Sequence, residues 1–243
     1  MGHLTDTNNR FEVKYLVDHR EVSSLLGEVQ GYLVADEYSD PERGYGLYSV
    51  YWDSPDLGFF WEKIEGLKYR KKLRFRRYVG SDEVHLEIKQ RTDRTLQKRR
   101  CRLPADEVDR LFADLAAGHG SLPSEEVDPV VAEAAVLCHR HRLAPRIGVR
   151  YQRRAFNGVY EPNLRVTLDT RVQYRRVEQG TAVEPFDVGK YIVDPRTTIM
   201  EVKFTGLVPL WLARTISRFN LQMIRMSKYC SAIDQEYYGG QLT

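Results

Sequence analysis

Charged side chains alternate with apolar ones along several short segments, and this alternation points to chemistry. One such segment runs from Lys68 to Tyr78, where alternate positions hold Arg70, Lys72, Arg74 and Arg76. In a strand these four side chains share one face, with neighbours roughly 6.5–7 Å apart. At that spacing one long phosphate chain can contact several guanidinium groups. The segment therefore predicts a surface for a polyanion.

The segments that follow strengthen this interpretation. Taken alone, a basic strand is more typical of a solvated edge that resists aggregation. However, His85, Glu87, Lys89 and Arg91 share the next ionic face, and a further cationic row contains Lys98, Arg100 and Arg102. Like charges that face each other across strands are destabilising unless an anion neutralises them. Three adjacent cationic strands therefore favour a bound polyanion.

Carboxylates on the ionic faces are few, and they are candidates for metal binding. They are Glu12, Glu87, Asp169 and Glu201. Hard divalent cations such as Mg²⁺ or Mn²⁺ take oxygen ligands, and phosphate oxygens complete the shell, so one or two carboxylates suffice. A salt bridge to a neighbouring Lys or Arg is an equally weighted alternative for each. Glu201 is the first metal candidate, followed by Glu12 and Glu87.

Other motifs exclude several classes of site. His139 and His141 lie two apart on a predicted helix and point in different directions, so they do not form a metal pair. No helix follows Gly44 and Gly46 at the spacing of a phosphate-binding loop. The three scattered cysteines argue against disulfides and a Cys-ligated zinc, and favour a reducing compartment. Phe75 lies opposite the arginines of its strand, which argues against nucleic acid as a partner.

The elements that must position these residues are mostly short strands. Strands are predicted at 11–17, 47–53, 66–79, 83–91, 95–103, 146–156, 163–176 and 197–205. Helices are predicted at 18–29, from 104 onward, at 125–143 and at 207–221. So many strands with one apolar and one ionic face predict a mainly β (α+β) fold. We expect a closed antiparallel β-barrel tunnel with flanking helices and an ionic lumen.

Length and charge set the limits of this fold. The 243 residues suit one domain over 10–235, with a helical excursion at 104–144, a flexible N-terminus at 1–9 and a C-terminal tail at 236–243. The net charge is only +3, so positive charge matters through its concentration in the central strands. The N-terminus has no apolar run, and no stretch approaches the length of a membrane span. We expect a soluble, cytoplasmic protein.

A set of short motifs in fixed order covers nearly the whole chain, from about residue 10 to 235. The motifs are Arg10–Tyr15, Ser49–Asp53, Leu73–Arg76, Leu86–Lys89, Tyr151–Phe156, Leu164–Asp169, Met200–Lys203 and Ser227–Tyr229. With these motifs the chain resembles the polyphosphate polymerase domain of the vacuolar transporter chaperone (VTC) family. That family lies within the triphosphate tunnel metalloenzyme (CYTH-like) superfamily.

The resemblance implies transfer of the γ-phosphoryl group of ATP onto a growing inorganic polyphosphate chain, with release of ADP and with Mn²⁺ or Mg²⁺ as cofactor. Carried over position by position, it implies catalytic roles for Lys14, Arg74, Arg76, Lys89, Arg153, Arg165 and Lys228. It implies phosphate-binding roles for Lys98, Tyr151, Arg225 and Ser227, and strand alternation adds Arg10, Lys72, Arg100 and Lys203. Glu201 matches the metal-binding glutamate, and Glu12 and Glu87 are the further metal candidates.

One position departs from the pattern of the superfamily. Many hydrolytic members open with two glutamates and a lysine in ExExK, whereas Arg10 holds the first place here. The loss of one acid favours the polymerase branch over the phosphatase and cyclase branches. Two alternatives stay open, namely a metal-dependent tripolyphosphatase or nucleoside triphosphatase on the same fold, and a non-catalytic polyphosphate-binding module. The chain resembles stand-alone bacterial versions, which leaves a separate membrane partner and the oligomeric state open.

Overall fold

A computed structural model describes residues 10–93, 95–116, 128–177 and 186–243. The chain divides into two compact units. The first unit comprises Met1–Tyr45, Gln152–Arg171 and Val193–Met226, and the second comprises Gly46–Tyr151, Val172–Ile192 and Ser227–Thr243. The predicted flexible N-terminus at 1–9 lies outside the described residues. The single domain over 10–235 stays a prediction.

The first unit is built on antiparallel strands covered by two helices. Its strands are β1 (Arg10–Asp18), β2 (Leu33–Ala35), β10 (Thr197–Thr205), β11 (Met223–Ile224) and parts of β7 (Ala144–Gly158) and β8 (Arg165–Arg176). Hydrogen bonds order them β11-β1-β10-β8-β7, and β2 pairs with β7. After β1, Asp18 accepts a hydrogen bond from the backbone of Arg20 and so begins η1 (His19–Glu21), which leads into α1 (Val22–Glu28).

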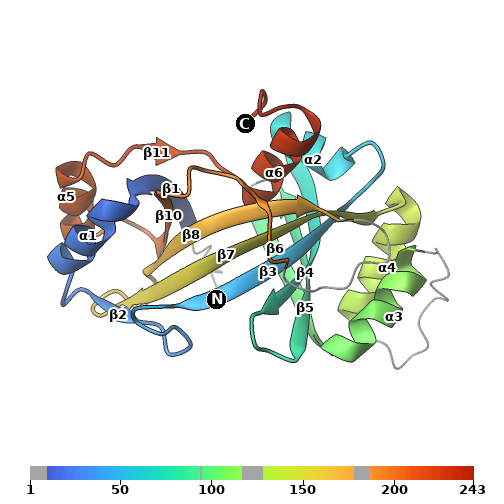
Figure 1. Cartoon of the computed structure of the whole chain (residues 1–243), viewed down its shortest axis with the longest axis horizontal. Coiled ribbons are helices and arrows are strands. Elements are labelled where there is room, and N and C mark those ends of the chain that lie inside the picture. The colour runs from blue at the N-terminus through green and yellow to red at the C-terminus, as the bar shows by residue number, and fades with distance from the viewer. Residues whose placement is uncertain (1–9, 94, 117–127, 178–185) are drawn as a thin grey trace, which may run out of the picture. The chain divides into compact units, whose positions relative to one another are not determined.

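The apolar faces of these strands form the core of the first unit. Figure 1 shows α1 beside α5 (Leu210–Arg218), and Arg218 of α5 pairs with Glu28 of α1 at 2.9 Å. Beneath the helices the core contains Tyr15, Val17, Val22, Leu25, Val166, Leu168, Met200, Val202 and Leu212. The alternate residues of the same strands are ionic, as the sequence predicts.

The second unit holds the basic strands. It contains β3 (Tyr45–Asp53), β4 (Tyr69–Tyr78), β5 (Glu83–Thr92), β6 (Thr95–Pro104) and β9 (Lys190–Tyr191). The hydrogen-bonded order is β7-β3-β4-β5-β6, and β9 pairs with β8. Its helices are α2 (Gly58–Ile64), α3 (Ala105–Ala116), α4 (Pro129–His141) and α6 (Lys228–Tyr237). Residues 117–127, within the predicted excursion at 104–144, lie outside the described residues.

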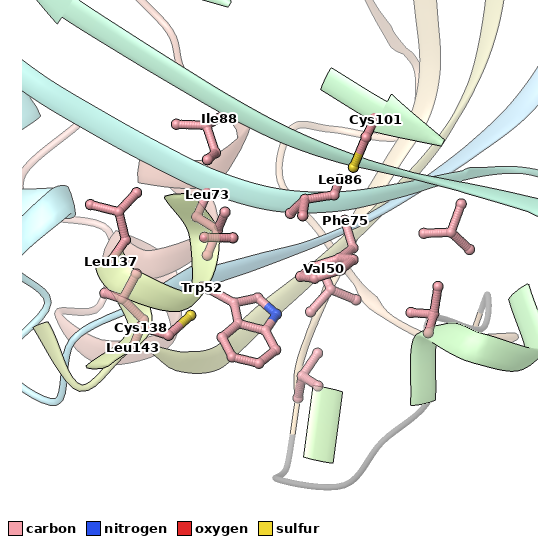
Figure 2. Close-up of a cluster of buried hydrophobic side chains, with 14 of the residues drawn as sticks. Val50, Trp52, Leu73, Phe75, Leu86, Ile88, Cys101, Leu137, Cys138 and Leu143 are labelled. Carbon is pink, nitrogen blue, oxygen red and sulfur yellow. The ribbon is translucent and has the colours of Figure 1, made fainter. Parts of the chain in front are cut away.

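Helices α3 and α4 cover the apolar face of β5 and β6 (Figure 1). Figure 2 shows the buried side chains beneath them, among which Leu73 and Phe75 of β4 and Leu86 and Ile88 of β5 have no exposed surface. Cys138 of α4 joins this core, and its burial raises the pKa of the thiol to about 12. Because apolar residues occupy every second position, the basic residues between them are turned to the opposite face.

The sheet does not close as the sequence analysis predicts. The hydrogen-bonded order ends at β11 on one side and at β6 on the other, and within the described residues these two strands are not paired. The antiparallel sheet and the flanking helices are confirmed, whereas the closed barrel is wrong. Alternation determines which face of a strand is buried, but closure also requires edge strands of matching length and register. Here β11 has only two residues.

Strand β2 and helix α6 are among the elements that the sequence analysis does not predict. Strand β2 is a three-residue segment, too short for an alternation to be visible. Helix α6 begins after Ser227, whose hydroxyl accepts a hydrogen bond from the backbone of Cys230. Leu242 and Thr243 donate backbone hydrogen bonds to Asp234 of α6. No helix in the described part of the chain is long and apolar enough to span a bilayer.

Candidate functional site

The ionic face of the second unit is a ladder of paired side chains, which we call the cationic wall. Its rungs are set by the register of β3, β4, β5 and β6. From one end to the other the rungs are Lys72–Lys89–Lys98, Tyr51–Arg74–Glu87–Arg100 and Ser49–Arg76–His85–Arg102. The predicted cationic rows of three strands are therefore brought together on one face.

Glu87 is the carboxylate of the central rung. Its Oε2 accepts a hydrogen bond from Nε of Arg74 at 2.7 Å, and its Oε1 lies 2.6 Å from Nζ of Lys98. Only 1% of the Glu87 side chain is exposed. Burial alone would raise the pKa of this carboxyl, but the charges of Arg74, Arg76 and Lys98 outweigh it and hold the pKa far below its usual range. Glu87 is therefore ionised and pairs with both Arg74 and Lys98.

Two tyrosines and a serine orient the arginines of β4. Arg74 donates from Nη1 to the hydroxyl of Tyr51 at 3.0 Å. Arg76 donates from Nε to Oγ of Ser49 and from Nη2 to the hydroxyl of Tyr151, both at 3.1 Å. These contacts fix the planes of both guanidinium groups, which favours paired contacts with phosphate oxygens.

The start of α6 adds one cation, Lys228, and the hydroxyl of Ser227 to the wall. Ser227 accepts a hydrogen bond from Nζ of Lys72 at 2.8 Å. The ammonium group of Lys228 lies 4.9 Å from the centre of the Tyr151 ring, within range of a cation–π interaction. Lys228 is mostly buried, with 8% of its surface exposed. The predicted residues Ser227 and Lys228 thus belong to the same surface as Arg76.

The first unit carries a different cluster, which we call the acidic cage. Lys14 lies 3.3 Å from Glu12 and 3.5 Å from Glu201, and Lys203 lies 3.9 Å and 3.3 Å from the same two carboxylates. The register explains this, since Glu12 is opposite Lys203 and Lys14 is opposite Glu201 across β1 and β10. Burial lowers the pKa of Lys203, although the two glutamates oppose the shift.

Arg153 extends the acidic cage through a buried pair. Its guanidinium group donates two hydrogen bonds to Asp169, at 2.6 and 2.7 Å, and approaches Glu201 at 3.4 Å. Arg165 pairs with Asp36 at 2.9 Å. The two predicted phosphate-clamping arginines of β7 and β8 are therefore each engaged by a carboxylate of the first unit.

The two clusters differ in their balance of charge. The described cations of the cationic wall, including the α6 residue Lys228, outnumber the carboxylates Glu83 and Glu87 that pair with it. The acidic cage balances Lys14, Arg153, Arg165 and Lys203 against Glu12, Asp36, Asp169 and Glu201. A surface with an excess of positive charge attracts polyphosphate, whereas grouped carboxylates attract a cation. Sequence position alone does not reveal this division.

Glu12 and Glu201 fit a hard divalent cation. They share two lysine partners, so their oxygens gather around one small region of the first unit. No group of three His, Cys, Asp or Glu residues suited to a metal occurs within the described residues, so phosphate or water would supply the other ligands. Glu87 fits less well, because Arg74 and Lys98 hold its oxygens at 2.5–2.7 Å, whereas the cations at Glu12 and Glu201 lie 3.3–3.9 Å away. Its metal role stays a prediction.

The remaining predicted residues are placed as follows. Lys89 lies between Lys72 and Lys98 in the register, and Arg100 is exposed on β6 opposite Glu87. Arg225 is exposed, and Arg10 is the first residue of β1, with its side chain outside the described part of the structure.

Sequence reasoning did not identify Tyr51 or Asp36 as site residues. Tyr51 sits on the ionic face of β3 and could have been found there by alternation, because it precedes the polar Asp53 by two residues. Asp36 follows the short β2 and carries no sequence signal. Asp169 was recognised on an ionic face, but its pairing with Arg153 depends on contacts that only the fold provides.

Comparison with known proteins places the chain in a family. A family model described as the VTC domain matches residues 9–237. The chain belongs to the VTC family. The resemblance seen in the motifs is thereby confirmed over nearly the whole chain. No curated protein matches the sequence.

Two solved structures share the fold of this VTC domain. A putative adenylyl cyclase from Hippeastrum, reported to have a dominant triphosphatase activity, has a TM-score of 0.52 at 14% identity, covering 93% of this chain and 94% of the other. A putative adenylate cyclase from Bacillus halodurans has a TM-score of 0.50 at 12% identity, covering 95% of this chain and 99% of the other. At these identities the likeness concerns the fold alone.

Proposed function

We propose that this VTC domain is a polyphosphate polymerase, which transfers the γ-phosphoryl group of ATP to the end of an inorganic polyphosphate chain and releases ADP. The observation that carries the proposal is the cationic wall, where arginines and lysines outnumber the carboxylates Glu83 and Glu87 that pair with them. Membership of the VTC family supports it. Phosphoryl transfer depends mainly on positioning and charge stabilisation, which such a wall supplies.

The transfer step needs no general base. A terminal oxygen of the polyphosphate chain is already anionic at neutral pH, and it forms a bond to the γ-phosphorus. The bond from the γ-phosphorus to the oxygen that bridges the β- and γ-phosphates breaks, and ADP leaves with that electron pair. We assign Arg74, Arg76, Arg153 and Arg165 to holding phosphates, and Lys14, Lys89 and Lys228 to neutralising the transferred group.

The carboxylates of the acidic cage provide the metal site in this proposal. Glu201 and Glu12 would hold Mn²⁺ or Mg²⁺, which neutralises phosphate charge when bound. Glu87 then serves as a positioning residue for Arg74, because its oxygen receives both the Nε and the Nη2 of that arginine. Arg10, Lys72, Lys98, Arg100, Tyr151, Lys203, Arg225 and Ser227 remain the proposed further phosphate contacts.

A triphosphatase is the second candidate. The fold neighbour from Hippeastrum, described as having dominant triphosphatase activity, favours it, although only the fold is shared. The same cations would hold the substrate, and water would replace the polyphosphate end as acceptor. The two candidates therefore differ in product rather than in binding.

Incubation of the purified protein with ATP and Mn²⁺ tests the proposal. We expect long chains on a gel stained for polyphosphate and no turnover by Arg74→Ala. The matched control is Arg77→Ala on the same strand, because Arg77 donates to the carbonyl of Ser81 instead of joining a rung with Glu87. Its turnover should equal that of the wild type.

Each other product pattern has a defined meaning. Orthophosphate without chains would contradict the polymerase and support the triphosphatase. Retained polyphosphate binding without turnover would leave a binding module. Equal loss of turnover in Arg74→Ala and Arg77→Ala would contradict the assignment of the cationic wall.

A further inference from the structure

Asp53, at the end of β3, is a fully buried carboxylate that the proposed reaction does not use. It accepts backbone hydrogen bonds from Ser54 at 2.8 Å and from Phe59 and Phe60 at 2.9 Å. These contacts fasten the chain around the start of α2 to the end of β3. None of its side chain is exposed. A buried carboxylate is costly unless such hydrogen bonds satisfy it.

Tyr229 supplies a hydrogen bond to Asp53 from a distant part of the sequence. Its hydroxyl donates to Oδ2 of Asp53, while Tyr229 itself lies in the first turn of α6. Asp53 therefore holds two helices, α2 through backbone groups and α6 through one hydroxyl group. Loss of that hydroxyl would remove this hydrogen bond to the first turn of α6 while leaving the contacts of Asp53 with α2 in place.

The ring of Tyr229 carries the connection onward to the cationic wall. It stacks on the ring of Tyr51, with centroids 4.9 Å apart, and Nζ of Lys72 lies 5.2 Å from its centre. Tyr51 in turn accepts a hydrogen bond from Arg74. A continuous series of contacts thus runs from Asp53 to a guanidinium group of the wall.

The neighbours of Tyr229 on α6 are the residues whose position matters. Ser227 and Lys228 directly precede it, and Ser227 receives the hydrogen bond from Lys72. The far end of α6 is secured separately, because Tyr238 stacks on Phe60 of α2 with centroids 5.6 Å apart. The Asp53–Tyr229 hydrogen bond therefore acts on the first turn of α6 in particular.

We propose that Asp53 and Tyr229 are positioning residues that fix the first turn of α6 on the cationic wall, so that Lys228 meets phosphate in one geometry. The inference rests on the proposed function, since it concerns the same reaction. Misplacement of a charged group by about 1 Å can cost roughly a hundredfold in rate. We therefore expect Tyr229→Phe to lower kcat by about ten- to a hundredfold.

A double-mutant cycle distinguishes positioning from a general structural role. We would measure kcat/KM for Tyr229→Phe, Lys228→Ala and their combination. If Tyr229 positions Lys228, the Lys228→Ala substitution lowers kcat/KM by a much smaller factor in the Tyr229→Phe background than in the wild type. Arg100→Ala, on β6, provides the comparison, because among the described residues Arg100 makes no hydrogen bond or ion pair with α6, so its effect should be the same in both backgrounds. Equal effects of Lys228→Ala in both backgrounds, within the roughly twofold scatter of independent sites, would overturn the inference.

Binding of tripolyphosphate, measured by calorimetry, separates this inference from the proposed function. The wild type should bind, and the same cycle on the dissociation constant should show the same coupling. A wild type that binds no tripolyphosphate would overturn the proposed function. A wild type that binds, with independent effects of Tyr229→Phe and Lys228→Ala, would overturn only the positioning role.

Because Asp53→Asn risks misfolding, the test relies on Tyr229→Phe, which removes one hydroxyl group and keeps the ring.

Discussion

Glu87 shows how one residue organises several others. It is the single carboxylate on its rung of the cationic wall, and its two oxygens receive Arg74 and Lys98. Breaking such a buried pair by removing one partner costs about 3–5 kcal/mol, because the other charge is left uncompensated. Glu87 thus stabilises the fold while it fixes the orientation of Arg74, a proposed phosphate contact.

The lowered pKa of Glu87 predicts a dependence of stability on pH. A carboxyl group whose pKa is lower in the folded state stabilises that state above its unfolded pKa, about 4.3 for glutamate. This contribution is lost as pH falls through the lower, folded-state pKa. The wild type should therefore exceed Glu87→Gln in free energy of unfolding at pH 7, and the difference should shrink below about pH 4.

Urea unfolding followed by circular dichroism at several pH values measures this difference. The other carboxyl groups titrate in both proteins, so only the difference between the two curves reports on Glu87. If the wild type and Glu87→Gln differ by the same free energy of unfolding at every pH from 7 to 3, the lowered pKa of Glu87 is contradicted.

Glu201 gives a second prediction at the scale of a residue. Replacement by Gln keeps its size but removes a charged oxygen ligand, so the Mn²⁺ concentration needed for half-maximal turnover should rise about tenfold or more. Mn²⁺ binding in the presence of tripolyphosphate, followed by electron paramagnetic resonance, should weaken in parallel. Glu28→Gln is the matched control, since Glu28 pairs with Arg218 outside the acidic cage. An unchanged Mn²⁺ requirement in Glu201→Gln would rule out the metal assignment.

Strands are the elements that give the site its precision. In β4 and β5 the buried residues Leu73, Phe75, Leu86 and Ile88 lock each strand, and the residues between them are thereby aimed at the opposite face. A register slip by one residue would exchange the two faces, so the apolar core and the cationic wall are specified together.

Leu86→Ala tests this dependence at the scale of the element. Leu86 has no exposed surface, and its truncation should lower the free energy of unfolding by about 2–5 kcal/mol. Leu96→Ala, at an exposed position of β6, should change it by only about 0.5 kcal/mol. Chemical denaturation of both variants gives the comparison, and similar losses in the two would contradict the assigned core.

The sequence predicts the strands well because alternation is a local property. The basic segment, the strand at 83–91 that follows it and the row of Lys98 and Arg100 are found where expected. Closure of the sheet was predicted wrongly, because pairing of edge strands depends on distant residues. Helix α6 was missed because its residues from Lys228 to Asp234 are all buried, which leaves no amphipathic pattern to read.

The candidate site was predictable only in part for the same reason. The types of residue that line it follow from alternation, and Glu87 and Arg74 share a rung by simple register. Asp36 follows the three-residue β2, where no periodic pattern exists, and the alternation that places Asp53 on a face of β3 does not reveal its partners. Their contacts with Arg165 and Tyr229 arise from tertiary packing.

At the scale of the whole molecule, the net charge is small, but charged side chains are grouped in separate clusters. The net charge of +3 conceals a cationic wall in the second unit and a balanced acidic cage in the first. We propose that the cationic wall holds most of the phosphate and that the acidic cage holds the metal. Arg74→Ala and Glu201→Gln should then impair the same reaction in different ways, the first through phosphate binding and the second through the metal requirement.

The fate of the γ-phosphoryl group tests the central claim most directly. Phosphorus-31 NMR of the protein with ATP and Mg²⁺ resolves internal chain phosphates, orthophosphate and ADP in one sample. The account predicts growth of the internal-phosphate signal in step with ADP, with little orthophosphate. Orthophosphate that rises in step with ADP, without internal chain phosphates, would contradict it and identify a triphosphatase.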